Sequence, residues 1–248
     1  MIIKPDCGVG ASNTYKIDSL ENLYQCLNTI DFFEHQYIME EFVPGHIETF
    51  DGIAGSGGQI LFCSSQVMKI TPLDMLSGCG ENVSYTNNLQ NSDLMTVGEK
   101  TVKAFDVRQG FFHFEFFRLD ADKQGLGKKD DIVGLEVNMR APGGYIPDKM
   151  NFAYNVDVYQ IWAESLVYGQ NKSFTDYKFC RYVTHYGRGA SVNYKHSAED
   201  ICGKFSNRLL IEKTPPKSIS GGMGTQVFIL ESQSVAQLEE DGAYILEK

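Results

Sequence analysis

Two segments of the chain carry acidic side chains inside apolar runs, an arrangement that could do chemistry. Glu115 lies within FFHFEFFRL, and Glu136 and Asn138 lie within IVGLEVNMR, which ends at Arg140. Because side chains alternate between the faces of a strand, Glu136, Asn138 and Arg140 are predicted to share one face. Burying a carboxylate is costly unless a cation or hydrogen-bond donors compensate it. Carboxylate and amide oxygens suit a hard cation such as Mg²⁺, so we predict a metal site here.

Arg140 follows this acidic element and predicts contact with an anion. The planar guanidinium binds phosphate or carboxylate groups through paired hydrogen bonds. The alternative is that Glu115, Glu136 and Asn138 belong to surface ion pairs with Lys128 and Lys129. The position of the acids inside apolar strands favours the metal site over these pairs.

A glycine-containing loop near the start of the chain could hold phosphate oxygens. Lys4 precedes the residues DCGVGASNT, which include Gly8, Gly10 and Ser12. Successive backbone N–H groups in such a loop can bind an anion. The segment lacks the Gly-Lys-Ser/Thr of a P-loop and the spacing of a dinucleotide-binding fingerprint. An ordinary hairpin turn therefore remains the alternative.

Composition limits the classes of partner and compartment. The chain has 248 residues and a net charge of −10, which argues against nucleic acid as a partner. Its six cysteines include no Cys-x-x-Cys pair, so a zinc site is not expected. No secretory leader or membrane-spanning run is recognisable, and we expect a cytoplasmic protein without a membrane partner.

The elements that must position these side chains can be outlined from periodicity and turn residues. Helices are expected near 18–33, 92–108 and 156–168, from their caps and apolar spacing. Strands are expected at 37–43, from residue 46 onwards and on both sides of Gly57-Gly58. Residues 70–91 are rich in Gly, Pro and Asn and are expected to form a solvated loop. The chain beyond 174 is expected to be rich in strands.

Taken together, these motifs resemble the ATP-grasp superfamily. The pattern consists of a lysine before a glycine loop, a strand ending in Glu-Glu-Phe-Val, Glu115 in an apolar strand, and Glu-x-Asn-x-Arg at 136–140. The likeness is greatest to the branch of biotin carboxylase and the large subunit of carbamoyl phosphate synthase. It implies an α+β fold in which two lobes with antiparallel sheets hold the nucleotide between them.

The resemblance also implies roles for individual residues. Glu115 and Glu136 would bridge two Mg²⁺ ions, with Mn²⁺ as an alternative, and Asn138 would bind the second ion. Asn138 and Arg140 would be catalytic, with Arg140 holding the substrate or the transferred phosphoryl group. The nucleotide would be bound by residues of three segments: Lys4 at the α- and β-phosphates, the lid loop with Gly8, Gly10 and Ser12, the adenine contacts Glu40, Glu41 and Val43, and the ribose neighbours His46 and Glu48.

The implied activity is that of an ATP-dependent ligase. A small carboxylate, or bicarbonate, would be activated as an acyl phosphate and attacked by an amine. The division implied is a partial lid at 1–43, a metal- and phosphate-binding lobe at 44–170, and a C-terminal region at 171–248 that resembles part of biotin carboxylase. We also expect a homodimer.

The start of the chain leaves two further hypotheses open. The sequence begins in a strand that runs into the glycine loop, whereas the family carries an upstream domain and a further phosphate-binding lysine. We therefore expect the chain to lack its N-terminal domain and to be inactive alone. A non-catalytic nucleotide-binding or assembly module is one alternative, and a phosphotransferase whose product stays phosphorylated is another.

Overall fold

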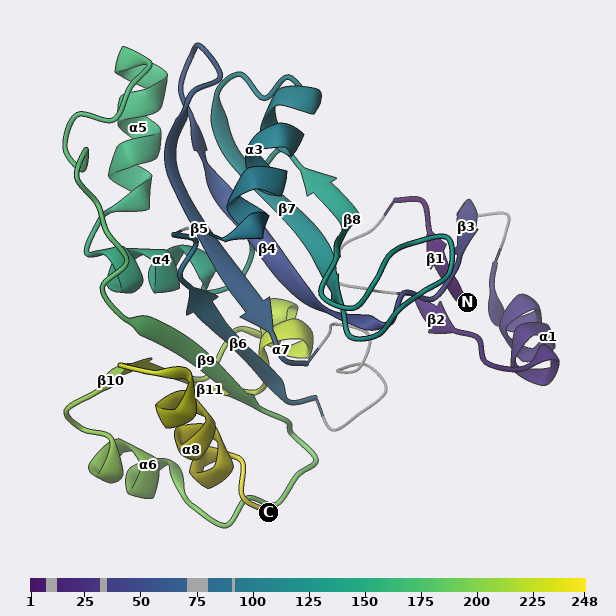
Figure 1. Cartoon of the computed structure of the whole chain (residues 1–248). Helices are drawn as coiled ribbons and strands as arrows, with labels where there is room; N and C mark the ends of the chain where they lie inside the picture. Colours follow the sequence, from purple (N-terminus) through teal and green to yellow (C-terminus); the bar gives the residue numbers. More distant parts are fainter. Residues whose placement is uncertain (8–12, 32–34, 71–79, 91) are drawn as a thin grey trace.

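The computed structural model describes residues 1–7, 13–31, 35–70, 80–90 and 92–248. The expected lid-loop residues Gly8, Gly10 and Ser12 lie outside these ranges. Within the described ranges, no helix is long and apolar enough to cross a membrane. The described residues form a small N-terminal sheet with one helix, and a large sheet with helices on both faces (Figure 1).

The small sheet has the strand order β2-β1-β3, and both of its pairings are antiparallel. Helix α1 begins after Ser19, whose side chain accepts a hydrogen bond from the backbone N–H of Asn22 and so caps the helix. Ile3 of the sheet packs with Ile30, which follows α1, in a small apolar core. The expected helix is confirmed, but it ends at Thr29. The elements are β1 (Ile2–Pro5), β2 (Tyr15–Lys16), α1 (Leu20–Thr29) and β3 (Tyr37–Glu40).

The large sheet has the order β10-β11-β9-β6-β5-β4-β7-β8, and its neighbouring strands are antiparallel. Strands from both halves of the chain therefore pair in one sheet, because β6 lies beside β9. The strands are β4 (Gly45–Ala54), β5 (Ile60–Met68), β6 (Asn82–Asn87), β7 (Gly110–Leu119), β8 (Ile132–Asn138), β9 (Tyr182–Arg188), β10 (Leu209–Lys213) and β11 (Gln226–Ser232).

The interpretation of residues 70–91 as a solvated loop is wrong for 82–87. These residues form β6 between β5 and β9, and Val83 and Tyr85 are buried. The polar residues of this segment pointed to a loop, but two of them are buried and hydrogen-bonded: Ser84 accepts from Lys149, and Thr86 accepts from the backbone N–H of Val183. Pairing with β5 and β9 thus makes this segment a strand, although its local preference for strand is weak.

Helices cover both faces of the large sheet. On one face α3 packs against Phe50, Phe112 and Phe114, and on the other α4 and α5 pack against residues that include Ile53 and Phe62. The helix expected at 156–168 is confirmed as α5, capped by Asp157, whereas α4 was not expected. The helices are α3 (Asp93–Ala104), α4 (Ile146–Tyr154), α5 (Val158–Tyr168), α6 (Ala198–Lys204), α7 (Lys217–Met223) and α8 (Val235–Ile245).

Gly98 sets how closely α3 approaches the sheet, and its replacement by alanine is expected to destabilise the protein. A Cβ atom added there would lie 2.3 Å from Cγ of the fully buried Phe50. Overpacking of this kind costs about 1–3 kcal/mol, which outweighs the gain in helix propensity of at most about 1 kcal/mol. Urea unfolding should show a lower free energy of unfolding for Gly98→Ala. Gly203→Ala in α6 is the control, because nothing lies within 4 Å of its added Cβ; equal effects of the two changes would contradict this packing.

Candidate active site

The predicted acidic pair comes together across β7 and β8. Glu115 is the register partner of Glu136, and His113 is the partner of Asn138. Directly opposed residues of an antiparallel pair point to the same face, with Cβ atoms about 4.5–5.5 Å apart. Glu136 is exposed and Glu115 is half-buried, so the pair lies where the sheet meets solvent. Two like charges at this spacing repel each other unless a cation lies between them.

The donors at this position fit a hard divalent cation. Glu115, Glu136 and Asn138 offer carboxylate and amide oxygens, which Mg²⁺ prefers, and Mg²⁺ commonly uses one or two carboxylates together with phosphate oxygens and water. Nδ2 of Asn138 is buried and has no hydrogen-bond partner among the described residues. Across all residues that the structure describes, no group of three or more His, Cys, Asp or Glu side chains is arranged to hold a metal ion. The site therefore depends on the amide and on ligand oxygens as well as on the two carboxylates.

A buried polar chain stands behind Glu115. His113 is 4% exposed and lies between two carboxylates, with Nδ1 2.5 Å from Asp51 Oδ1 and Nε2 3.0 Å from Glu115 Oε1. Burial opposes the charge on this imidazole, but Asp51 and Glu115 outweigh it and raise the pKa of His113 to about 10. Strand alternation alone puts His113 on the face of Glu115. The contact with Asp51 could not be predicted, because it depends on the register of β4 with β7.

Arg140 lies just beyond β8, exposed to solvent, and donates from Nη1 to the carbonyl oxygen of Ala141 at 3.0 Å. Among the residues that the structure describes, neither Lys128 nor Lys129 forms an ion pair with Glu115 or Glu136; their backbone N–H groups bond to Asp131 and Asp122 instead. The alternative of surface ion pairs therefore gains no support from these contacts. Arg140 is placed so that its guanidinium can meet an anion from solvent.

The expected nucleotide contacts of the N-terminal segment lie on and after the small sheet. Lys4 of β1 forms an ion pair with Glu40 of β3, with Nζ 2.7 Å from Oε2. Glu41 lies 3.4 Å from Nζ of Lys123, which also donates to the carbonyl oxygen of Phe42 at 3.1 Å. These contacts connect the small sheet to the loop between β7 and β8. Val43 is half-buried at the start of the large sheet, and its adenine role stays a prediction.

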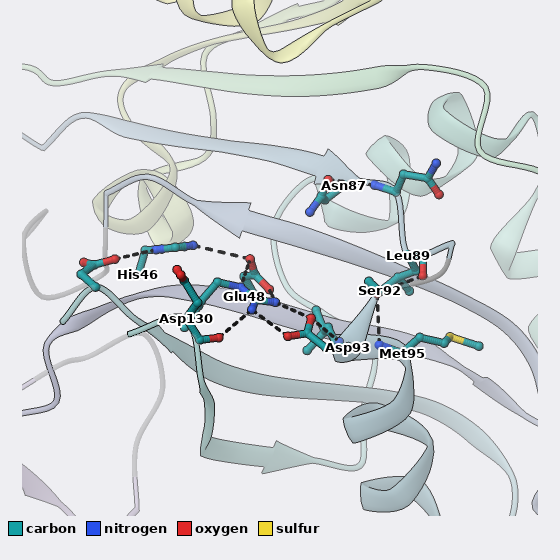
Figure 2. Close-up of polar contacts among 12 residues, drawn as sticks. His46, Glu48, Asn87, Leu89, Ser92, Asp93, Met95 and Asp130 are labelled. Atoms are coloured by element: carbon teal, nitrogen blue, oxygen red, sulfur yellow. Dashed lines mark hydrogen bonds and ion pairs between the residues drawn. The ribbon is translucent and has the colours of Figure 1, made fainter. Parts of the chain in front are cut away.

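His46 and Glu48 belong to a network centred on Arg118 (Figure 2). Arg118 donates to both oxygens of Glu48 at 2.9 Å, and to both oxygens of Asp93 at the start of α3. Burial would raise the pKa of Glu48, but hydrogen bonds from His46 and Arg118 outweigh it and lower that pKa. Glu48 alternates with Thr49 along β4, so it lies on the α3 face rather than on the Glu115 face.

A second buried cation lies on the Glu115 face, further into the sheet. Lys149 of α4 is 1% exposed, and its Nζ donates to Ser84 Oγ at 2.8 Å and to Ser84 O at 3.2 Å. Burial lowers the pKa of Lys149 to about 7, although the charge of Asp51 opposes this change. The side-chain amide of Gln66, on the same face of the sheet, is also fully buried and has no hydrogen-bond partner among the described residues. The burial of Lys149 could not be predicted from the sequence, since α4 itself was not expected.

Comparisons with known proteins support the fold. No family model matches the chain. An L-arginine-specific L-amino acid ligase of Bacillus subtilis is 29% identical over 182 residues, which are 67% of this chain and 39% of that protein. The crystal structure of L-amino acid ligase from Bacillus licheniformis is similar with a TM-score of 0.66 and 15% identity, covering 97% of this chain and 60% of that one.

Two further solved structures show the same arrangement. N5-carboxyaminoimidazole synthetase from Staphylococcus aureus, complexed with ADP, has a TM-score of 0.62 at 13% identity and covers 97% of this chain and 59% of that one. Biotin carboxylase from Campylobacter jejuni has a TM-score of 0.58 at 10% identity and covers 94% and 53%. The chain thus spans less than two thirds of each of these proteins. These neighbours are ATP-grasp enzymes, and the α+β organisation expected from the sequence is confirmed: the chain has the ATP-grasp fold.

Proposed function

We propose that the protein is an ATP- and Mg²⁺-dependent ligase that joins a carboxylate to an amine. An oxygen of the substrate carboxylate attacks the γ-phosphorus of ATP, the bond from that phosphorus to the β–γ bridging oxygen breaks, and ADP leaves. The amine nitrogen then attacks the acyl carbon, phosphate leaves, and the nitrogen loses a proton. The observation that carries this proposal is the opposition of Glu115 and Glu136 across β7 and β8, with Asn138 beside them, in an ATP-grasp fold.

The residues of the chain would share the work of binding and positioning. In phosphoryl transfer the protein mainly orients the groups and compensates their charge. Glu115, Glu136 and Asn138 would hold two Mg²⁺ ions, which when bound neutralise charge on the phosphate oxygens. Arg140 would orient the substrate carboxylate or the transferred phosphoryl group. Lys4 would leave its partner Glu40 to meet the α- and β-phosphates.

The rest of the nucleotide would be bound by the segment around the hinge. In this proposal Glu40, Glu41 and Val43 contact the adenine and His46 lies near the ribose, while Glu48, which is buried on the α3 face and bound by Arg118, would act through His46 rather than contact the sugar. Residues 1–43 form part of the lid, 44–170 the metal-binding lobe, and 171–248 the C-terminal region. The lid closes over the site and excludes water from a reactive acyl phosphate.

The names of the relatives suggest the substrate class. Two of them are amino acid ligases, one from Bacillus subtilis and one from Bacillus licheniformis. We therefore propose amino acids as the first carboxylates and amines to test. A homodimer and a cytoplasmic location belong to the same proposal.

Two measurements test the proposed function. Mg-ATP at a hundred times its dissociation constant should stabilise the 248-residue chain by about 2.7 kcal/mol in thermal unfolding, and omission of Mg²⁺ should reduce this gain. With amino acids added, free phosphate and an amide-linked product should form together; because the chain is expected to be inactive alone, this second measurement uses the chain extended by the domain that the family carries upstream. Absence of nucleotide binding would overturn the proposal. Binding without turnover would favour the non-catalytic module, and a product that stays phosphorylated would favour the phosphotransferase.

A further inference from the structure

The side chain of Glu115 is held from behind by a chain of hydrogen bonds that reaches into the sheet. The chain begins at the backbone N–H of Gln66 in β5, which donates to Thr49 Oγ1 at 3.0 Å. The hydroxyl of Thr49 donates to Asp51 Oδ2 at 2.5 Å, and the other oxygen of Asp51 lies 2.5 Å from Nδ1 of His113. His113 Nε2 then lies 3.0 Å from Glu115 Oε1.

Each hydrogen bond in this series has one donor and one acceptor. Thr49 accepts from an N–H and donates its own hydrogen to a carboxylate. Each nitrogen of His113 faces a carboxylate oxygen, so the ring carries both protons and donates in both directions. Asp51 and Thr49 are fully buried. Since buried charge-assisted hydrogen bonds are short and directional, the imidazole has little freedom to turn.

The consequence for Glu115 is a fixed carboxylate. His113 binds Oε1 and so restrains the position of that oxygen, while Glu136 lies directly across the strand pair. Partners behind a metal ligand orient it, and their loss typically costs about 10–100-fold in metal affinity. We propose that Asp51 and His113 are positioning residues that orient Glu115 for a divalent cation shared with Glu136. This inference rests on the metal site of the proposed function and adds the residues that determine its affinity.

The test compares metal binding in variants that each change one buried polar side chain. Mn²⁺ serves as the probe, in the presence of saturating ADP, and free Mn²⁺ is measured by its electron paramagnetic resonance signal. Asp51→Asn and His113→Leu are expected to weaken Mn²⁺ binding by about 10–100-fold. The control is His185→Leu, because His185 is also a buried histidine, lies on β9 of the same sheet and bonds instead to the carbonyl oxygen of Met223.

Two further measurements distinguish a positioning role of His113 from a purely structural one. Thermal unfolding should show that His113→Leu and His185→Leu both destabilise the fold. In the Mn²⁺ titration, only His113→Leu should raise the Mn²⁺ concentration required for half-saturation. His113→Gln, which retains a donor, should recover part of the affinity and replaces His113→Leu if that variant does not fold. Parent-like Mn²⁺ affinity in folded Asp51→Asn and His113 variants would overturn the inference. If Glu136→Gln still abolishes binding in that case, the proposed function stands; if the parent binds no Mn²⁺ with ADP, both are wrong.

Discussion

Replacing Glu136 by glutamine is expected to weaken binding of the Mg-nucleotide by at least about 100-fold, since a direct ligand should matter at least as much as the groups behind it. The change keeps the size of the side chain but removes the charge that opposes Glu115 across the strand pair. Glu136 is exposed, so the fold should tolerate the substitution. Isothermal titration with Mg-ADP, or with Mn²⁺ and ADP, measures the loss.

The matched control for this change is Glu99→Gln. Glu99 is an exposed glutamate of α3, on the opposite face of the large sheet from Glu115. It should leave nucleotide affinity unchanged. Equal affinities of Glu136→Gln and the parent would show that the acidic pair does not bind the cation.

Replacing Lys149 by methionine is expected to stabilise the protein at neutral pH, because an apolar side chain of similar size carries no cost of burying a charge. The pKa of Lys149 is lowered by burial from 10.5 to about 7. Between these values the unfolded chain binds one more proton than the folded chain, so the parent gains stability as pH rises, at about 1.4 kcal/mol per pH unit. The variant lacks this gain, and its advantage over the parent should shrink from pH 7 towards pH 10.5.

Urea unfolding at several pH values measures this difference. Loss of the Lys149–Ser84 hydrogen bonds will reduce the stabilisation but does not depend on pH in the same way. Lys100→Met, which removes an exposed lysine of α3, is the control and should not show the trend. A Lys149→Met advantage that stays constant from neutral to alkaline pH would contradict the assignment of a depressed pKa.

Local patterns were sufficient to predict much of the fold. Serine before an apolar-periodic segment is a typical helix cap, and Ser19, Ser92 and Ser234 each accept the capping hydrogen bond of a helix. Strands β7 and β8 were predictable from their alternation of apolar and polar residues. Strand β6 was not, because its pairing with β9 joins residues about a hundred positions apart, and no local signal reports such a contact.

The candidate site also has a part that the sequence predicts and a part that it does not. The shared face of Glu136 and Asn138 follows from strand alternation alone, and the register of β7 with β8 then brings Glu115 opposite Glu136. The supporting group Asp51 could not be predicted, since the register of β4 against β7 depends on packing across the whole sheet. The partner Arg118 of Glu48 was missed for the same reason.

The most direct test is a crystal structure of the chain with Mn²⁺ and ADP, in which anomalous scattering locates the metal. The account predicts Mn²⁺ bound by carboxylate oxygens of both Glu115 and Glu136 and by the amide oxygen of Asn138, with His113 still bonded to Glu115. A Mn²⁺ ion bound elsewhere, or lysine side chains that cap the two glutamates in the nucleotide complex, would contradict it.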